Sequence, residues 1–214
     1  MKKILLPFLV FVITSIKLYA QDSFEGVIQF SIEYTIVDSS SGISEKMLKD
    51  IYGDRAEMYY SRNGDFKIKY RNSHNITTEA DADYYFVAKD HLYSTYTLKS
   101  KIDSTNITKE LSELLTFEKQ KNQKILGKEC DCYIYKAIDE YKEPVNFTYC
   151  FSEGSPIINP DRYTKYTHFY LRDFFKISQR PYLKFSYEIE GYIMSFTATK
   201  LEVKEINSEV FTFK

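Results

Sequence analysis

Apolar and polar residues alternate with a period of two along most of the chain. The clearest run covers residues 27–37, in which the even positions from Ile28 to Ile36 are apolar and the odd positions from Gln29 to Thr35 are polar. Successive side chains of a β-strand point to opposite faces. This run therefore predicts a long strand with one apolar face and one polar face.

Three further pairs of such runs are joined by residues that favour tight turns. An Asn-Gly pair, for example, supplies the positive φ angles that a two-residue hairpin requires. The turns are expected at Asn63-Gly64, at Lys89-Asp90 and at Glu190-Gly191. The pattern predicts antiparallel hairpins as the main elements.

Helical periodicity is found in the segment NPDRYTKYTHFYLRDFF, residues 159–175. Asn159 can cap the first turn of a helix, and Pro160 can occupy that turn. Aromatic residues then recur every three or four positions, as on one side of a helix. This stripe consists of Tyr163, Tyr166, Tyr170 and Phe174. We expect one helix that ends near Ser178, with the stripe facing either the core or an apolar ligand.

Residues 105–117 support two interpretations. Leu111, Leu114 and Leu115 fit one side of a short helix, whereas the threonines and Ile107 favour a strand. Both interpretations remain open at this level.

A sheet with one apolar face has to bury that face. One or two helices are too small to cover a flat sheet of so many strands, so the sheet is expected to curl around them. The prediction is a mainly β (α+β) fold, in which a curved antiparallel sheet, or half-barrel, wraps around one or two helices. No linker or repeat divides the chain, so residues 21–214 are expected to form a single domain.

Residues 1–20 have the pattern of a secretory signal peptide. Lys2 and Lys3 precede an apolar run, and the small residue Ala20 stands before the polar Gln21, where we expect cleavage. The apolar run is shorter than the roughly 20 residues that cross a bilayer. The mature protein is therefore expected without a transmembrane span, in the periplasm, outside the cell or at the cell surface.

Charge and composition narrow the class of partner. The formal net charge is -1 and no block of like charges is present, which argues against nucleic acid as a partner. Hydrophobic residues make up 43% of the chain, enough for one well-packed core.

Several short segments carry a family resemblance. They are KILGKECDCYIYK at residues 124–136, FTYCFSEGSPIINP at 147–160, Phe24 with Gly26 and Ile28, and the closing pattern of Thr197, Ala198, Leu201, Ile206 and Phe211. They resemble segments of periplasmic families of unknown function, including the GLPGLI type, that are related to the lipoprotein-carrier (LolA-like) fold. The GLPGLI hexapeptide itself is absent, and the aromatic segment 163–175 stands in its place.

This resemblance implies a curved antiparallel sheet around helices, exported to a bacterial periplasm or surface. It implies no known enzymatic activity, and it includes a carrier relative that binds acyl chains. No catalytic residue is carried over from these families.

The three cysteines favour a disulfide over a metal or redox site. Three thiols without a neighbouring histidine do not supply the four ligands of structural zinc, and the spacing of Cys130 and Cys132 is not Cys-x-x-Cys. In an oxidising compartment the default is a disulfide. If residues 130–137 and 145–151 pair as a hairpin, Cys150 lies opposite Cys132 or Cys130. We favour Cys132 with Cys150, a link worth about 3 kcal/mol in the loop-entropy model.

Strand parity places a constraint on this bridge. Cys150 shares its parity with Asn146 and Thr148, so a bridge has to lie on the less apolar face of the sheet or beside a bulge. Three free buried thiols are the alternative.

No catalytic, cofactor or metal site can be assembled from the sequence. His74, His91 and His168 are far apart, and the acidic residues that alternate along strands are typical of a solvated face.

Two function classes remain. The first is an exported, non-catalytic binding domain of the cell envelope that holds a lipid, an acyl chain or another apolar ligand in the concave face of its sheet. The second is a structural or interaction module with a filled interior that binds another envelope protein. An uncharacterised enzyme ranks third.

Overall fold

The computed structural model describes residues 23–73, 82–87, 91–96, 101–106, 108–189 and 191–212. Its strands are β1 (Gly26–Ile36), β2 (Arg55–Tyr60), β3 (Phe66–Arg71), β4 (Ala82–Val87), β5 (His91–Tyr96), β6 (Lys101–Asn106), β7 (Glu113–Ile125), β8 (Lys128–Ile138), β9 (Pro144–Phe151), β10 (Lys184–Ile189) and β11 (Tyr192–Val203). Its α-helices are α1 (Glu45–Tyr52) and α2 (Leu171–Ser178), and its 3₁₀ helices are η1 (Ser39–Ser41), η2 (Pro160–Tyr163), η3 (His168–Tyr170) and η4 (Ser208–Phe211).

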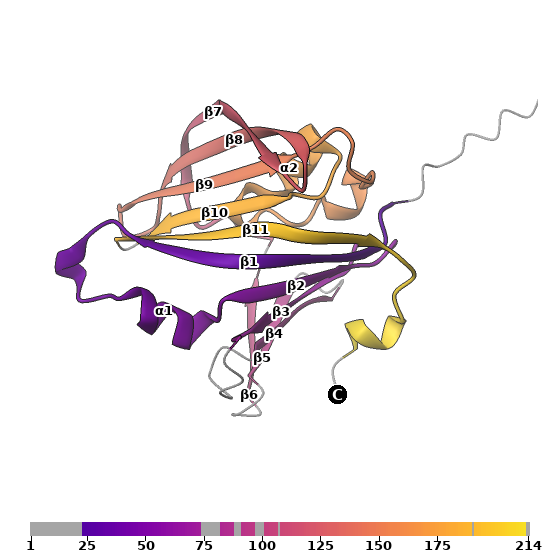
Figure 1. Cartoon of the computed structure of the whole chain (residues 1–214), viewed down its shortest axis with the longest axis horizontal. Coiled ribbons are helices and arrows are strands. Elements are labelled where there is room, and N and C mark those ends of the chain that lie inside the picture. Colours follow the sequence, from indigo (N-terminus) through magenta and orange to yellow (C-terminus); the bar gives the residue numbers. More distant parts are fainter. Residues whose placement is uncertain are drawn as a thin grey trace, which may run out of the picture.

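All of these strands belong to one 11-stranded sheet, in the order β6-β5-β4-β3-β2-β1-β11-β10-β9-β8-β7. Neighbouring strands are antiparallel throughout. The sheet is strongly curved: β7 to β9 arch over α2, while β3 to β6 turn steeply away from β1 (Figure 1). β6 and β7 remain its two edges, so the sheet is not closed. The expected fold class is confirmed.

The alternating pattern determines which face is buried. In β1, Ile28, Phe30 and Ile32 are at most 3% exposed, whereas Glu33 and Thr35 point to solvent. The expected hairpins are also present, since β2 pairs with β3, β4 with β5, and β10 with β11. The tight two-residue turn expected at Asn63-Gly64 was wrong: Tyr60 pairs with Phe66, so the loop has five residues, and only Gly64 of the pair has a positive φ. Glu190 of the third expected turn lies outside the described residues. The turn at Lys89-Asp90 lies outside the described residues, as do Ala20 and Gln21 at the expected cleavage site.

The single helix expected over residues 159–178 is broken into three pieces. Asn159 caps the first piece, η2, by accepting a hydrogen bond from the N–H of Asp161. The helix is then interrupted because Phe169 and Tyr170 have left-handed backbone angles, with φ of 57° and 59°. The last piece, α2, ends at Ser178 as expected. The prediction of one continuous helix was therefore wrong, although its last residue was right.

Both ends of the segment 105–117 are strands: β6 ends at Asn106 and β7 begins at Glu113, while Ile107 lies outside the described residues. Glu113 begins β7, and Leu111, Leu114 and Leu115 are 39%, 44% and 56% exposed. These leucines do not form a buried helical stripe.

Helix α1 is not among the expected elements. Ser44 caps it by accepting a hydrogen bond from the N–H of Met47, and Gly53 ends it. Leu48 is its one buried residue. Met47, Leu48, Ile51 and Tyr52 do follow a helical spacing, so this short helix had a signal in the sequence that was missed.

Candidate functional site

The segment of residues 156–183, here called the plug, lies against the concave face of the sheet. It contains η2, η3 and α2, and β7 to β11 arch around it (Figure 1). The four stripe residues Tyr163, Tyr166, Tyr170 and Phe174 all belong to it and are between 0% and 6% exposed. The broken helix thus still directs the whole stripe inward.

Aromatic rings from the sheet and the plug alternate across this interior. Tyr149 on β9 stacks between Phe174 of the plug and Phe185 on β10, with ring centroids 4.6 and 4.7 Å away. Tyr135 on β8 stacks on Tyr170 at 5.2 Å. Such pairs contribute about 0.5–1.5 kcal/mol each beyond the area they bury. The part of the concave face under the plug is therefore filled by the protein's own side chains.

The plug is also fastened to the β2–β3 hairpin. The hydroxyl of Tyr166 donates to the carbonyl oxygen of Gly64 at 2.8 Å, and its ring lies 5.3 Å from that of Phe66. A Cβ atom at Gly64 would lie 2.6 Å from the Cβ of Arg162. Glycine is required at this turn because its φ is +91° and because the plug approaches it so closely.

Other apolar side chains of the same interior, some of them in the plug itself, are only half-buried. We call them the apolar rim; it consists of Ile68 and Tyr70 on β3, Phe169 and Leu171 of the plug, and Tyr187 on β10. Within the rim, Phe169 stacks on Tyr187 at 6.2 Å. Tyr70 reaches this pair only through the buried rings of Phe196, 6.0 Å away, and Phe185, which lies 5.9 Å from Phe196 and 6.1 Å from Phe169. The rim is therefore an apolar surface on the concave face of the sheet, and solvent can reach it.

The backbone beside the rim is strained. Phe169 and Tyr170 are consecutive residues with side chains, and both adopt the left-handed conformation. Such a conformation costs roughly 1–3 kcal/mol per residue and persists only where the surroundings hold it. The packing around η3 therefore holds these two residues in place.

His168 precedes this pair of residues and is mostly buried. Burial lowers the pKa of its imidazole to about 4. Its Nδ1 has no hydrogen-bond partner among the residues that the structure describes. The ring, which lies 3.8 Å from that of Phe169, is therefore neutral at pH 7 and serves as a packing group.

The interior contains buried hydroxyl groups. The hydroxyls of Tyr60, Tyr135 and Tyr163 are buried without a partner in the described part of the chain. Burial raises the pKa of the Tyr60 hydroxyl well above its usual value of 10.0, so this phenol stays protonated. Such groups can donate hydrogen bonds to a ligand, but they do not activate a nucleophile.

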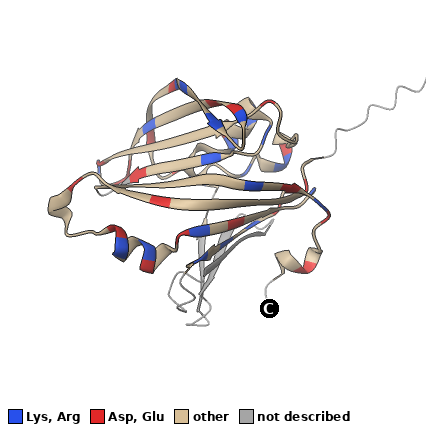
Figure 2. Cartoon of the chain, in the orientation of Figure 1, with Lys and Arg blue, Asp and Glu red and all other residues tan. Residues whose placement is uncertain are grey.

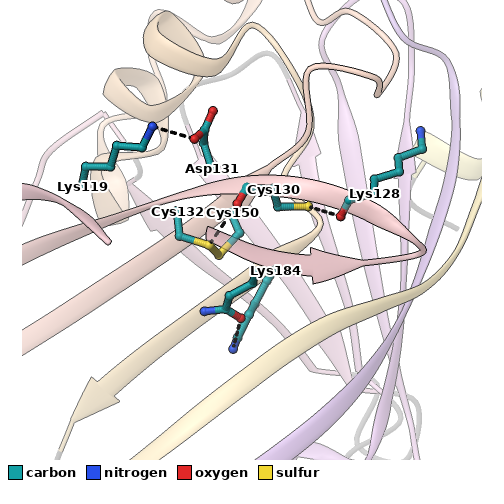
Figure 3. The surroundings of a disulfide bond; sticks show 8 residues. Lys119, Lys128, Cys130, Asp131, Cys132, Cys150 and Lys184 are labelled. Carbon is teal, nitrogen blue, oxygen red and sulfur yellow. Dashed lines mark hydrogen bonds and ion pairs between the residues drawn. A yellow bond between two sulfur atoms is a disulfide. The ribbon is translucent and has the colours of Figure 1, made fainter. Parts of the chain in front are cut away.

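The cysteines lie on the outer face of the sheet. Cys132 on β8 stands directly opposite Cys150 on β9, and the two form a disulfide with their Cα atoms 4.1 Å apart (Figure 3). Both are fully buried, and Lys184, the neighbour of Cys150 on β10, donates from Nζ to Gln123 Oε1 at 3.0 Å. The bridge is the pair that the hairpin register favoured, on the less apolar face that parity required.

Cys130 remains a free thiol. It is fully buried, and burial raises the pKa of its thiol. The reactive thiolate is therefore scarce, and the residue serves as a small core side chain.

Charges of both signs are interspersed over the described part of the chain. Lysine and arginine alternate with aspartate and glutamate along the strands and α1 (Figure 2). In the described ranges, no group of three or more His, Cys, Asp or Glu side chains is placed to hold a metal ion. Nor does any helix there have the length and apolar character needed to cross a membrane.

Known proteins resemble this chain only weakly. No protein-family model matches the chain, and no curated protein matches its sequence. Among solved structures, the lipoprotein LppX of Mycobacterium tuberculosis matches with a TM-score of 0.41 and 12% identity, over 86% of this chain and 89% of that one. A domain from Vibrio parahaemolyticus described as an outer membrane lipoprotein-sorting protein matches with a TM-score of 0.37 and 7% identity, over 90% and 92% of the two chains. At such TM-scores the function has to be argued from this chain's own residues.

Proposed function

We propose that the protein is an exported, non-catalytic binding domain of the bacterial cell envelope that holds a lipid or another apolar ligand at the apolar rim. The observation that carries this proposal is the half-burial of Ile68, Tyr70, Phe169, Leu171 and Tyr187 on the concave side of the sheet. Apolar side chains gathered in a concave face, with a few hydroxyls among them, are typical of sites for apolar ligands. An acyl chain laid along the rim would remove this surface from water, at about 25 cal/mol per Å².

Export is part of the same proposal. Residues 1–20 act as the signal peptide, with cleavage between Ala20 and Gln21. The disulfide between Cys132 and Cys150 supports an oxidising compartment, where such bonds persist. The mature chain then works in the periplasm, outside the cell or at the cell surface.

A second candidate function has an observation of its own. The plug fills much of the interior, and the edge strand β7 exposes Leu114, Leu115 and Phe117 to solvent. An unpaired strand edge with apolar side chains can bind another polypeptide. In this alternative the protein is a structural or interaction module, and its partner is another envelope protein.

One experiment separates the two functions. The mature protein is purified from its own envelope, and native mass spectrometry is combined with lipid extraction. The carrier function predicts a co-purifying lipid or fatty acid in stoichiometric amount. A bare chain, or one that carries another polypeptide and no lipid, contradicts it.

A further inference from the structure

The edge strand β7 is exposed on both of its faces. Its residues 113–119 are all exposed, and among the described strands only β8 pairs with it. Figure 1 shows β7 as the outermost strand of the arch. The outer edge of β7 therefore presents backbone N–H and C=O groups that another strand can bind.

Exposed apolar side chains gather at the start of this strand. They are Leu111, Leu114, Leu115 and Phe117, four within seven residues. The ring of Phe117 stacks on that of Tyr133 on β8 at 5.3 Å, so it is held in one orientation although much of it is exposed. Apolar side chains grouped in this way on an unpaired edge are typical of an interaction surface.

Only the middle of β7 is regular enough to accept another strand. The pairing with β8 shifts register between Leu114 and Thr116 and again between Gln120 and Gln123. Bulges of this kind hinder pairing along an edge. Between the two shifts, residues 116–120 pair with β8 one by one. A second strand is therefore expected to dock on this stretch.

The charges of β7 suit a second, antiparallel copy of the same strand. Glu113 at its start and Lys121 near its end are both exposed. Neither forms an ion pair within the described part of the chain, whereas Glu118 and Lys119 between them do so with β8. When two identical strands pair antiparallel, the acidic start of one lies beside the basic end of the other. A copy of this chain thus supplies the charge that each end lacks.

Symmetry limits how two copies can pair. A two-fold axis between antiparallel strands sets one residue opposite its own counterpart. An axis at Glu118, Lys119 or Gln120 would set like charges opposite each other, which is destabilising. An axis at Thr116 would pair residues whose side chains, because of the bulge beside it, point to different faces. An axis at Phe117 avoids both problems, since it sets Thr116 opposite Glu118 on one face of the sheet.

We propose that the protein forms a symmetric dimer through β7, with Phe117 on the two-fold axis. The two sheets then join into one continuous sheet, and Glu113 of each copy comes near Lys121 of the other. The dimer goes beyond the proposed function and does not depend on a ligand at the apolar rim. It gives to a second copy of this chain the edge that the second candidate function gives to another envelope protein.

The oligomeric state of the mature protein provides the first test. Sedimentation velocity is measured over a series of concentrations for the unaltered chain, Leu115→Lys and Val203→Lys. Both variants replace an exposed apolar residue, but only Leu115 lies on β7, where the new lysine would face Lys119 of the other copy. We expect Leu115→Lys to raise the dissociation constant of the dimer by about tenfold or more, since the change occurs twice in each dimer. Val203→Lys should leave it unchanged. A monomer at every concentration, or a dimer that Leu115→Lys does not weaken, would refute the proposal.

A crosslink locates the axis and also serves if Leu115→Lys folds poorly. Phe117→Cys brings two thiols opposite each other on neighbouring antiparallel strands, as Cys132 and Cys150 are within the chain. After oxidation with copper phenanthroline, non-reducing gel electrophoresis should show a covalent dimer for Phe117→Cys. Val203→Cys and the unaltered chain, whose Cys130 is fully buried, should show none. A lack of crosslinking in Phe117→Cys would contradict an axis at this residue.

Fatty-acid binding distinguishes the failure of this inference from that of the proposed function. Leu115→Lys should bind a fluorescent fatty acid as the unaltered chain does, because Leu115 lies outside the rim. A monomeric protein that binds the fatty acid would refute the dimer and leave the proposed function intact. A dimer that binds no fatty acid would support the dimer and contradict the proposed function.

Discussion

Cys132 and Cys150 face each other across β8 and β9, on the outer side of a sheet whose inner side is packed with aromatic rings. The bridge therefore ties the two strands that carry Tyr135 and Tyr149 without occupying the apolar interior. It fixes their register from the opposite side, so that each ring stays aligned with its partner in the plug.

Removal of this bridge should destabilise the fold without changing the interior. Cys132→Ser with Cys150→Ser is expected to lower the free energy of unfolding by about 3 kcal/mol, because the unfolded chain regains the entropy of the closed loop. Denaturant unfolding under non-reducing conditions measures this, with Cys130→Ala as the control. Thiol labelling of the denatured, non-reduced protein should modify Cys130 alone; labelling of all three cysteines would contradict the bridge.

The plug should contribute strongly to stability through Phe174, which is 1% exposed. Phe174→Ala is expected to cost about 3–5 kcal/mol, since it leaves a cavity among stacked rings. Phe117→Ala removes the same side chain from β7, where it is 41% exposed, and should cost much less. Chemical denaturation of both variants gives the comparison. Similar losses would mean that the plug is not part of the cooperative core.

The close approach of the plug to the β2–β3 hairpin predicts a difference between two glycines. Gly64→Ala should destabilise the protein by roughly 2 kcal/mol or more, because the new methyl group strains the backbone and also collides with Arg162. Gly127 also has a positive φ, +75°, but a Cβ atom added there would have no neighbouring heavy atom within 4 Å. Gly127→Ala should therefore cost only the roughly 1–2 kcal/mol of the left-handed conformation. Thermal or denaturant melts test this; equal effects would show that the plug does not touch the hairpin.

Stability should fall in mildly acidic solution because of His168. Burial lowers the pKa of this histidine from 6.5 to about 4, so the unfolded chain binds the proton first. The free energy of unfolding is therefore highest above pH 6.5 and falls as the pH is lowered towards 4. Because one pKa unit corresponds to about 1.4 kcal/mol, His168 can account for a loss of at most roughly 3 kcal/mol. Denaturant midpoints measured across this range should fall less steeply for His168→Phe. An unchanged pH profile in that variant would count against a buried neutral imidazole.

The apolar rim should be sensitive to a single charge. Ile68→Asp is expected to weaken the binding of a fluorescent fatty acid by about tenfold or more, because a carboxylate would have to be desolvated against the acyl chain. Val203→Asp makes the same kind of change at the end of β11, where Val203 is 69% exposed, and should leave binding intact. Equal affinities of the two variants, each shown to be folded by circular dichroism, would place the ligand elsewhere.

The sequence was sufficient for the parts of the fold that rest on strict alternation. The period of two depends on local chemistry alone, and the structure confirms β1 and the pairing of β2 with β3 and of β10 with β11. The tight turn at Asn63-Gly64 was not confirmed, because the loop there runs from Ser61 to Asp65. The hairpin pattern limited the partner of Cys150 to Cys132 or Cys130, and the structure pairs it with Cys132, the favoured of the two.

What the sequence did not reveal depends on distant contacts. The break at Phe169 and Tyr170 has no local signal such as glycine or proline, and it is held by Glu110, which is 60 residues away. The three leucines near the start of β7 suggested a helix because their spacing is helical, but pairing with β8 decides the strand. The apolar rim could not be predicted from the sequence either, because the exposed fraction of its side chains depends on where the plug ends.

The central claim is that an apolar ligand lies along the rim, between β3 and the η3 turn. A photoactivatable fatty acid, crosslinked to the mature protein and mapped by mass spectrometry of its peptides, tests this most directly. The account predicts that the label concentrates on the peptides that contain Ile68, Tyr70, Phe169, Leu171 and Tyr187. Labelling confined to the exposed edge of β7, or no labelling above that of the denatured protein, would contradict it.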